Sequence, residues 1–215
     1  MGEHILARSS CAQVPLDLWN YQEILHEVQP ELIFETGTYQ GGSALFLASI
    51  CELLGRGQVL TIDVDRRKDR PRHARITYLT GSSTSNAILR QVRQRVKGTS
   101  PVLVILDSGH AKEHVLAELH AYAPLVPPGS YVIVEDTNLN GHPVESDHGP
   151  GPADAVAEFL EDNDAFVRHE SREKFMLTFN PGGYLKKREI TPGSAPGFLR
   201  GRPWRHRRNN RHSRD

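Results

Sequence analysis

The chain has 215 residues, a length that suits one domain with a sizeable hydrophobic core. Its 26 Lys and Arg residues balance 26 Asp and Glu residues, which excludes the strongly basic class of nucleic-acid-binding proteins. Two cysteines, Cys11 and Cys51, exclude a disulfide-rich framework and fit a reducing compartment. No apolar run approaches the roughly 20 residues that cross a bilayer, and the N-terminus lacks a signal-peptide core. We therefore expect a soluble, cytoplasmic protein.

The first two thirds of the chain alternate between strand and helix patterns. A helix is predicted at 15–28, ended by Pro30. Apolar strands are predicted at 32–36, 58–63, 76–80, 102–107 and 131–136. Helices are predicted between most of them, at 43–54, 84–96 and 112–123. This alternation is typical of a doubly wound, Rossmann-like α/β domain with a mostly parallel sheet.

The sequence after residue 137 is predicted to form one edge of that sheet. A Gly/Pro/His-rich loop at 138–152 and a helix at 153–163 precede two strand-like segments, 166–171 and 174–187. Their short separation predicts an antiparallel pair at one edge. We divide the chain into an N-terminal helical segment (1–30), an α/β domain (31–187) and a basic, disordered tail (188–215) in which residues 200–215 hold seven arginines.

Acidic residues end four of the five predicted parallel strands. They are Glu35, Asp63, Asp107 and the pair Glu135 and Asp136. In an open α/β sheet, ligands bind beyond the carboxyl ends of the strands, so these carboxylates point toward one rim. Such acids can instead cap the helices that follow, but five at one rim favour a binding site.

The segment "ETGTYQGGS", residues 35–43, forms a glycine turn after the first strand. It does not match the dinucleotide pattern G-x-G-x-x-G. The acid beside the turn repels a pyrophosphate and attracts a cation, which suits S-adenosylmethionine (SAM) better than NAD. Asp63 is placed to bind ribose hydroxyls of either cofactor. The predicted cofactor contacts are Glu35, Gly37, Tyr39, Gly41, Gly42, Ser43, Asp63, Ser82 and Asp107.

Asp107, Glu135 and Asp136 follow two strands that we expect to be neighbours. Clustered carboxylates repel each other unless a cation lies between them, and oxygen ligands suit Mg²⁺ or Mn²⁺. Adjacent residues of a strand point to opposite faces, so both acids reach one ion only if the strand ends or twists there. His110, three residues after Asp107, is a candidate base, although such a histidine is often a surface or capping residue.

Several segments in order resemble the cephalosporin hydroxylase/rhamnosyl O-methyltransferase family. They are "ETGTYQGGSALFLA", "LDSGHAKEHVLAELHAYAPLVPPGSYVIVEDT", "NGHPV", "GPGPADAVAEFL" and "REKFMLTFNPGGYLKK", within residues 15–187. The resemblance implies a class I SAM-dependent methyltransferase fold and a divalent metal. It also implies metal ligands at Asp107, Glu135 and Asp136, catalytic roles for His110 as base and for Asp107, and a homo-oligomer.

The chain departs from the family pattern in places. Gly109 stands where Asp or Asn is common, and His148 where an aromatic is common. Gly109 leaves room that would enlarge the pocket or loosen His110, which keeps a catalytically weak SAM-binding accessory protein as an alternative. The arginine-rich tail raises an RNA-binding methyltransferase as a further one.

We expect an O-methyltransferase that acts on a hydroxyl of a sugar or another small, polyhydroxylated natural product. An oxygenase is the rival that the family name suggests, and His114, His142 and His148 make an iron site conceivable. No 2-His-1-carboxylate spacing supports it.

Overall fold

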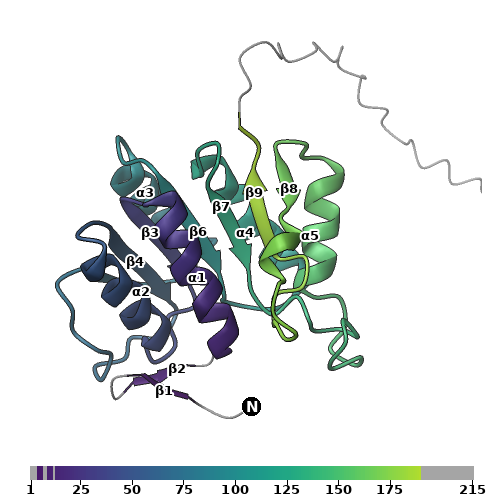
Figure 1. The fold of residues 1–215 in the computed structure, drawn as a ribbon, viewed down its shortest axis with the longest axis horizontal. Coiled ribbons are helices and arrows are strands. Elements are labelled where there is room, and N and C mark those ends of the chain that lie inside the picture. The colour runs from purple at the N-terminus through teal and green to yellow at the C-terminus, as the bar shows by residue number, and fades with distance from the viewer. Residues whose placement is uncertain (1–3, 7–8, 12, 190–215) are drawn as a thin grey trace, which may run out of the picture.

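The computed structural model describes residues 4–6, 9–11 and 13–189, and a seven-stranded sheet lies at its centre (Figure 1). The strand order is β5-β4-β3-β6-β7-β9-β8. The first five of these strands run parallel, whereas β9 is antiparallel to both β7 and β8. The strands are β3 (Leu32–Thr36), β4 (Gln58–Asp63), β5 (Ile76–Thr80), β6 (Val102–Leu106), β7 (Tyr131–Val134), β8 (Phe166–Arg168) and β9 (Tyr184–Lys187). The predicted mostly parallel sheet with an antiparallel edge pair is confirmed.

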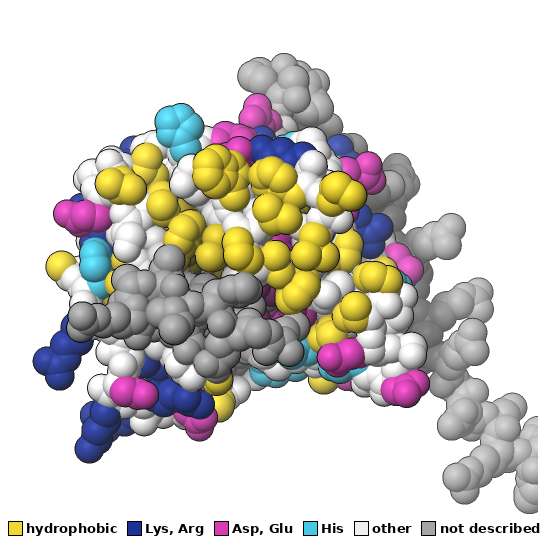
Figure 2. All heavy atoms as spheres, turned by 60° about the horizontal axis from the view of Figure 1, so that its bottom comes forward, with side chains coloured by type: hydrophobic (Ala, Val, Ile, Leu, Met, Phe, Trp, Pro, Cys, Tyr) yellow, Lys and Arg dark blue, Asp and Glu magenta, His cyan; other side chains and the backbone are white. Residues whose placement is uncertain are grey.

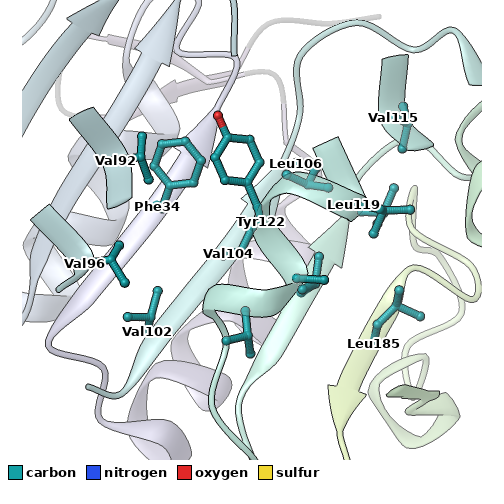
Figure 3. Packing of buried hydrophobic residues seen from close by; sticks show 14 of the residues in the cluster. Phe34, Val92, Val96, Val102, Val104, Leu106, Val115, Leu119, Tyr122 and Leu185 are labelled. Atoms are coloured by element: carbon teal, nitrogen blue, oxygen red, sulfur yellow. The ribbon is translucent and has the colours of Figure 1, made fainter. Parts of the chain in front are cut away.

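Helices cover both faces of the sheet because alternate strand residues point to opposite sides. Ile33 packs with α1 and α2, whereas its neighbour Phe34 packs with α3, α4 and α5. On the Phe34 side, its ring lies 4.6 Å from that of Tyr122 (centroid to centroid), among valines and leucines from several elements (Figure 3). The helices are α1 (Pro15–Val28), α2 (Gly42–Leu53), α3 (Asn86–Val96), α4 (Lys112–Tyr122) and α5 (Pro152–Glu161), with short 3-10 turns η1 (Ala123–Leu125) and η2 (Glu170–Arg172).

The predicted strands 131–136 and 174–187 are shorter than expected. The strand β7 ends at Val134, so Glu135 and Asp136 lie in the turn beyond it, where Asp136 has a positive φ of 56°. The second edge segment is a strand only at Tyr184–Lys187, not from residue 174. Pro181 and Gly182, the latter with φ of 70°, form a turn one residue before it, and a proline has no N–H to give a strand ladder.

A short hairpin of β1 (His4–Leu6) and β2 (Ser9–Cys11) was not predicted. The expected basic tail, apart from its first two residues, lies outside the described residues. Within the described part of the chain, no helix is both long enough and apolar enough to span a membrane.

Candidate active site

The parallel strands end level with one another, which brings the residues that follow them to one rim. Thr36 at the end of β3 pairs with Ile62 of β4 and with Leu106 of β6, and Leu106 pairs with Val134 of β7. Asp63, Asp107 and Glu135 therefore each follow directly on this common line. The rim lies at the bottom of the view in Figure 1. The predicted gathering of strand-end acids follows from this register.

None of these acids caps the helix that follows it. The N-cap residues of α2, α3, α4 and α5 are Gly41, Ser85, Ala111 and Gly151. The strand-end carboxylates thus serve something other than helix capping.

A cavity of about 610 Å³ opens at this rim, beyond the carboxyl ends of the strands. That volume is typical of a site for a small molecule or cofactor. Nine of the predicted site residues line it: Gly37, Tyr39, Gly42, Ser43, Asp63, Ser82, Asp107, His110 and Asp136. Three others, Glu35, Gly41 and Glu135, are not among its lining residues.

Glu35 lies beneath the glycine turn and is 1% exposed. The Thr61 hydroxyl donates a hydrogen bond of 2.6 Å to its Oε2 atom. Burial raises the pKa of Glu35 to about 7, although hydrogen bonds from Ser43 and Thr61 oppose the shift. Burial therefore favours the protonated form of this carboxyl, which is hydrogen-bonded to Ser43 at the start of α2.

Position 37 requires a glycine because the backbone there lies very close to the backbone of Asp107. A Cβ atom built on it would lie 1.6 Å from the carbonyl oxygen of Asp107, and its φ of 84° is left-handed. This glycine therefore lets the β3 turn lie against the residue that follows β6. Gly37 also lines the cavity, and its contact with the cofactor stays a prediction.

Asp63 is held by three groups of the chain. Its Oδ2 accepts a 2.7 Å hydrogen bond from the backbone N–H of Tyr39 and lies 2.9 Å from Nη2 of Arg70, while Oδ1 accepts from the backbone N–H of Asp65. These contacts fix the carboxylate at the cavity wall, with 15% of its side chain exposed. Its role on a ribose stays a prediction.

Asp107, His110 and Asp136 come together at the β6–β7 side of the cavity. One ligand atom from each lies within 4.8 Å of the others, and Nε2 of His110 is 3.4 Å from Oδ2 of Asp136. Gln13 donates a 2.7 Å hydrogen bond to Oδ2 of Asp107. Burial, followed by the charges of Glu135 and Asp136, raises the pKa of Asp107 well above its usual range, and burial also raises that of Asp136. Ionised carboxylates here need a compensating positive charge.

Glu135 points toward α1 in this structure. Its Oε1 accepts a 2.6 Å hydrogen bond from the hydroxyl of Tyr21, which in turn accepts one from the amide of Asn180. Asn180 also accepts a hydrogen bond from the backbone N–H of Asp136 through Oδ1. Tyr21 and Asn180 therefore orient both members of the Glu135–Asp136 pair.

A family model described as rhamnosyl O-methyltransferase/CmcI matches residues 4–188. The chain belongs to this family. A rhamnosyl O-methyltransferase of Mycobacterium bovis (strain BCG / Pasteur 1173P2) is 41% identical over 184 residues, 82% of this chain and 75% of that relative. The corresponding protein of Mycobacterium leprae (strain TN) is 40% identical over 182 residues, 81% of this chain and 79% of its own. The predicted class, a SAM-dependent O-methyltransferase, is confirmed.

Solved structures share the fold at low identity. CmcI with Mg and SAM superposes with a TM-score of 0.66 at 19% identity, over 86% of this chain and 76% of CmcI. The MycE methyltransferase of the mycinamycin biosynthetic pathway, in complex with Mg, SAH and mycinamycin VI, has a TM-score of 0.55 at 18% identity and covers 84% of this chain and 51% of MycE. These likenesses confirm the class I methyltransferase fold of this family member.

Sequence reasoning missed a polar network beside the predicted site of this O-methyltransferase. The fully buried Glu118 accepts a 2.7 Å hydrogen bond from Ser108 and a 3.3 Å bond from Thr36. Nε2 of His114 lies 3.0 Å from the Ser108 hydroxyl, and the hydrogen bond with Glu118 raises the pKa of His114. The i, i+4 spacing of His114 and Glu118 was the one sequence signal for this pair.

A basic surface was also missed. Arg66, Arg67, Lys68 and Arg72 are exposed on the connection from β4 to β5, and with Arg70 they line a hollow of about 500 Å³. Lys and Arg side chains gather at the lower left of the face in Figure 2, in which the rim is turned toward the viewer. The equal totals of basic and acidic residues in the chain do not reveal this local excess of positive charge.

Proposed function

We propose that this protein transfers the methyl group of SAM to a hydroxyl of a sugar or another small, polyhydroxylated natural product, with Mg²⁺ or Mn²⁺ at the Asp107 group. The observation that carries the proposal is the position of Asp107, His110 and Asp136 in the wall of a cofactor-sized cavity. The rhamnosyl O-methyltransferase relatives support a sugar hydroxyl as acceptor.

The cofactor is proposed to lie over the ends of β3, β4 and β5. The turn at Gly37 and Tyr39 faces the methionine part, Asp63 accepts ribose hydroxyls, and Ser82 lies on the side of β5. SAM supplies an electrophilic methyl group on a sulfonium. The chain's contribution is to hold that group in line with the acceptor oxygen, which is where much of a methyl-transfer barrier can be removed.

The metal is proposed to be held by Asp107 and Asp136, with Glu135 as the third predicted ligand. The donor set fits a hard cation, because carboxylate oxygens predominate and burial disfavours their charged forms without one. A bound Mg²⁺ lowers the pKa of a hydroxyl in its coordination sphere. Tyr21 bonds one oxygen of Glu135, so this residue would share its carboxylate between α1 and the ion.

His110 is proposed to take the proton of the attacking hydroxyl. Its imidazole is 35% exposed and lines the cavity beside Asp136, so it reaches both the acceptor position and solvent. The neutral ring accepts the proton at Nε2 or Nδ1, and Asp136 stabilises the imidazolium that results. The donor set of two carboxylates and one histidine differs from the 2-His-1-carboxylate triad, which disfavours the oxygenase alternative.

Isothermal titration with S-adenosylhomocysteine (SAH) and with NAD tests the cofactor. We expect SAH to bind and NAD to give no heat. Asp63→Asn, which keeps the shape of the side chain but removes its charge, should weaken SAH binding by about 1–3 kcal/mol because charged hydrogen bonds are lost. Binding of NAD without a response to SAH would contradict the proposal.

A further inference from the structure

The hollow on the connection from β4 to β5, which we call the basic hollow, is lined by cations and hydroxyls and by no acid of the described residues. It has a volume of about 500 Å³ and lies beside β5, an edge strand of the sheet. Its lining residues are Arg66, Arg67, Lys68, Arg70, Arg72, Tyr78 and Thr80. Like charges held this close repel one another, so the five cations favour an anionic ligand between them.

The acids of the same connection do not neutralise the exposed cations of the basic hollow. Asp65 comes no closer than 4.0 Å to Nη2 of Arg67. Within the described part of the chain, no ion pair involves Asp69 or the other three exposed cations of the hollow. Arg75, just before β5, differs from them, because it is bonded to the carboxylate of Glu52 and to a backbone carbonyl. The exposed cations of the hollow therefore have no such structural use.

Arg70 gives the basic hollow a fixed guanidinium group in its wall. The residue is 8% exposed, and its Nε donates a 2.8 Å hydrogen bond to the carbonyl oxygen of Tyr39. Nη2 lies 2.9 Å from Oδ2 of Asp63, without the alignment of a hydrogen bond. The guanidinium also lies over the ring of Tyr78, with 5.8 Å from Cζ to the ring centroid. Nη1 has no hydrogen-bond partner among the described residues, so a held guanidinium keeps one nitrogen for a ligand.

We propose that the basic hollow binds the phosphate group of an organic ligand, a function additional to methyl transfer. Arg66, Lys68 and Arg72 contact the phosphate oxygens from the surface, and Nη1 of Arg70 contacts them from the wall. Guanidinium groups suit phosphate because their N–H groups match its oxygens in pairs of hydrogen bonds. A volume of about 500 Å³ fits an organic phosphate or diphosphate. Arg67 lines both this hollow and the cofactor-sized cavity, so the bound phosphate lies beside the mouth of that cavity.

Two variants of equal charge test this site. The hollow variant carries Arg66→Ala, Lys68→Ala and Arg72→Ala. The control, which we call the helix variant, removes the same charge from exposed positions of α3 that do not line the hollow, and it carries Arg90→Ala, Arg93→Ala and Arg95→Ala. All six side chains are exposed, so both variants should fold as the wild type does.

Isothermal titration with sodium pyrophosphate measures binding, at physiological ionic strength and in EDTA so that no divalent ion takes part. The hollow variant should bind pyrophosphate about tenfold more weakly or worse, because charge-assisted hydrogen bonds are lost. The helix variant should stay within about twofold of wild type, because salt screens charges that do not contact the ligand. Equal losses in the two variants would show a general attraction of charge and would overturn the proposal.

The phosphate can belong to a soluble molecule or to the headgroup of an anionic lipid, and vesicles separate the two sources. Sedimentation with vesicles of phosphatidylglycerol, and with vesicles of phosphatidylcholine as the neutral control, measures the lipid source. Binding to phosphatidylglycerol alone that is lost in the hollow variant and kept in the helix variant assigns the phosphate to a lipid headgroup. Binding of pyrophosphate without binding of vesicles assigns it to a soluble ligand. Binding of neither probe by the wild type would overturn the proposal.

Discussion

Nε2 of His110 lies 3.4 Å from Oδ2 of Asp136, across the gap between the ends of β6 and β7. The histidine is 35% exposed and the aspartate 19%, so the pair lies at the boundary between the cavity and solvent. A histidine in this position can take a proton from an acceptor or can itself ligate a metal ion. The two roles predict different mutant behaviour.

His110→Ala should lower kcat by about 10²–10⁴-fold, because positioned proton transfer typically contributes that much. As a base, His110 contributes little to holding the metal or the cofactor, so the Mg²⁺ concentration for half-maximal activity and the SAH affinity should stay near wild type. Raising the pH should partly restore kcat, because hydroxide replaces the imidazole. Titration of Mg²⁺ against activity decides between the roles, since a large loss of metal affinity would identify His110 as a ligand.

Mg²⁺ should stabilise the protein more at pH 8 than at pH 6. Burial raises the pKa of Asp107 and of Asp136, so at the lower pH protons compete with the cation for the same oxygens. Differential scanning calorimetry with Mg²⁺ and with EDTA at both pH values measures this difference in Tm. Asp136→Asn is the control and should abolish the Mg²⁺ effect at both; an equal Mg²⁺ effect at pH 6 and pH 8 in the wild type would show that these acids are already ionised without metal.

Glu35→Gln should remove part of the pH dependence of stability. Below pH 4.5 the carboxyl is protonated in both the folded and the unfolded states. Between about 4.5 and 7 it stays protonated in the folded state while it ionises in the unfolded chain. The free energy of unfolding therefore falls as the pH rises through this window, by about 3 kcal/mol. Above pH 7 the loss is complete.

Urea unfolding of wild type and Glu35→Gln between pH 4 and pH 8, in EDTA and without cofactor, measures this contribution. Other buried acids titrate in both proteins, so the difference between the two curves isolates Glu35. Parallel curves would mean that the Glu35 carboxyl is already ionised in the folded protein at pH 5.

Gly37→Ala should destabilise the protein by more than about 3 kcal/mol, because its Cβ would overlap the Asp107 carbonyl oxygen in addition to the left-handed strain. Gly55→Ala is a matched control. Gly55 has a similar φ of 72° but nothing within 4 Å of the added Cβ, so only the backbone cost of about 1–2 kcal/mol should appear. Chemical denaturation of the two variants measures both costs; equal losses would show that the β3 turn can move away from Asp107.

The sequence predicted the elements and the rim because both depend on local patterns. Strands such as Val102–Leu106 are continuous apolar runs, and acidic residues lie at or just beyond the ends of four of the five parallel strands. Local sequence patterns could not predict the contacts of the site between residues that are far apart in the chain. Gln13 and Asp107 are 94 residues apart, and Tyr21 and Glu135 are 114 apart, so these hydrogen bonds exist only because the segment at α1 packs against the rim.

The backbone conformation at Asp136 also depends on a residue that is distant in the chain. A period-two strand pattern predicted that Glu135 and Asp136 point to opposite faces, unless the strand ended there. The structure ends it at Val134, and the positive φ of Asp136 is supported by the hydrogen bond of its N–H to Asn180. Asn180 is 44 residues away in the chain, which no local pattern at Asp136 reveals.

Methyl transfer from SAM to methyl α-L-rhamnoside is the most direct test of the central claim, which is that the rim combines a SAM site with a metal-holding carboxylate group. The measurement is mass spectrometry of the glycoside after incubation with Mg²⁺, with EDTA, and with Asp136→Asn in Mg²⁺. The account predicts a singly methylated glycoside and equimolar SAH with Mg²⁺, and neither product in EDTA or with the variant. Methylation at an undiminished rate in EDTA and by Asp136→Asn would contradict it.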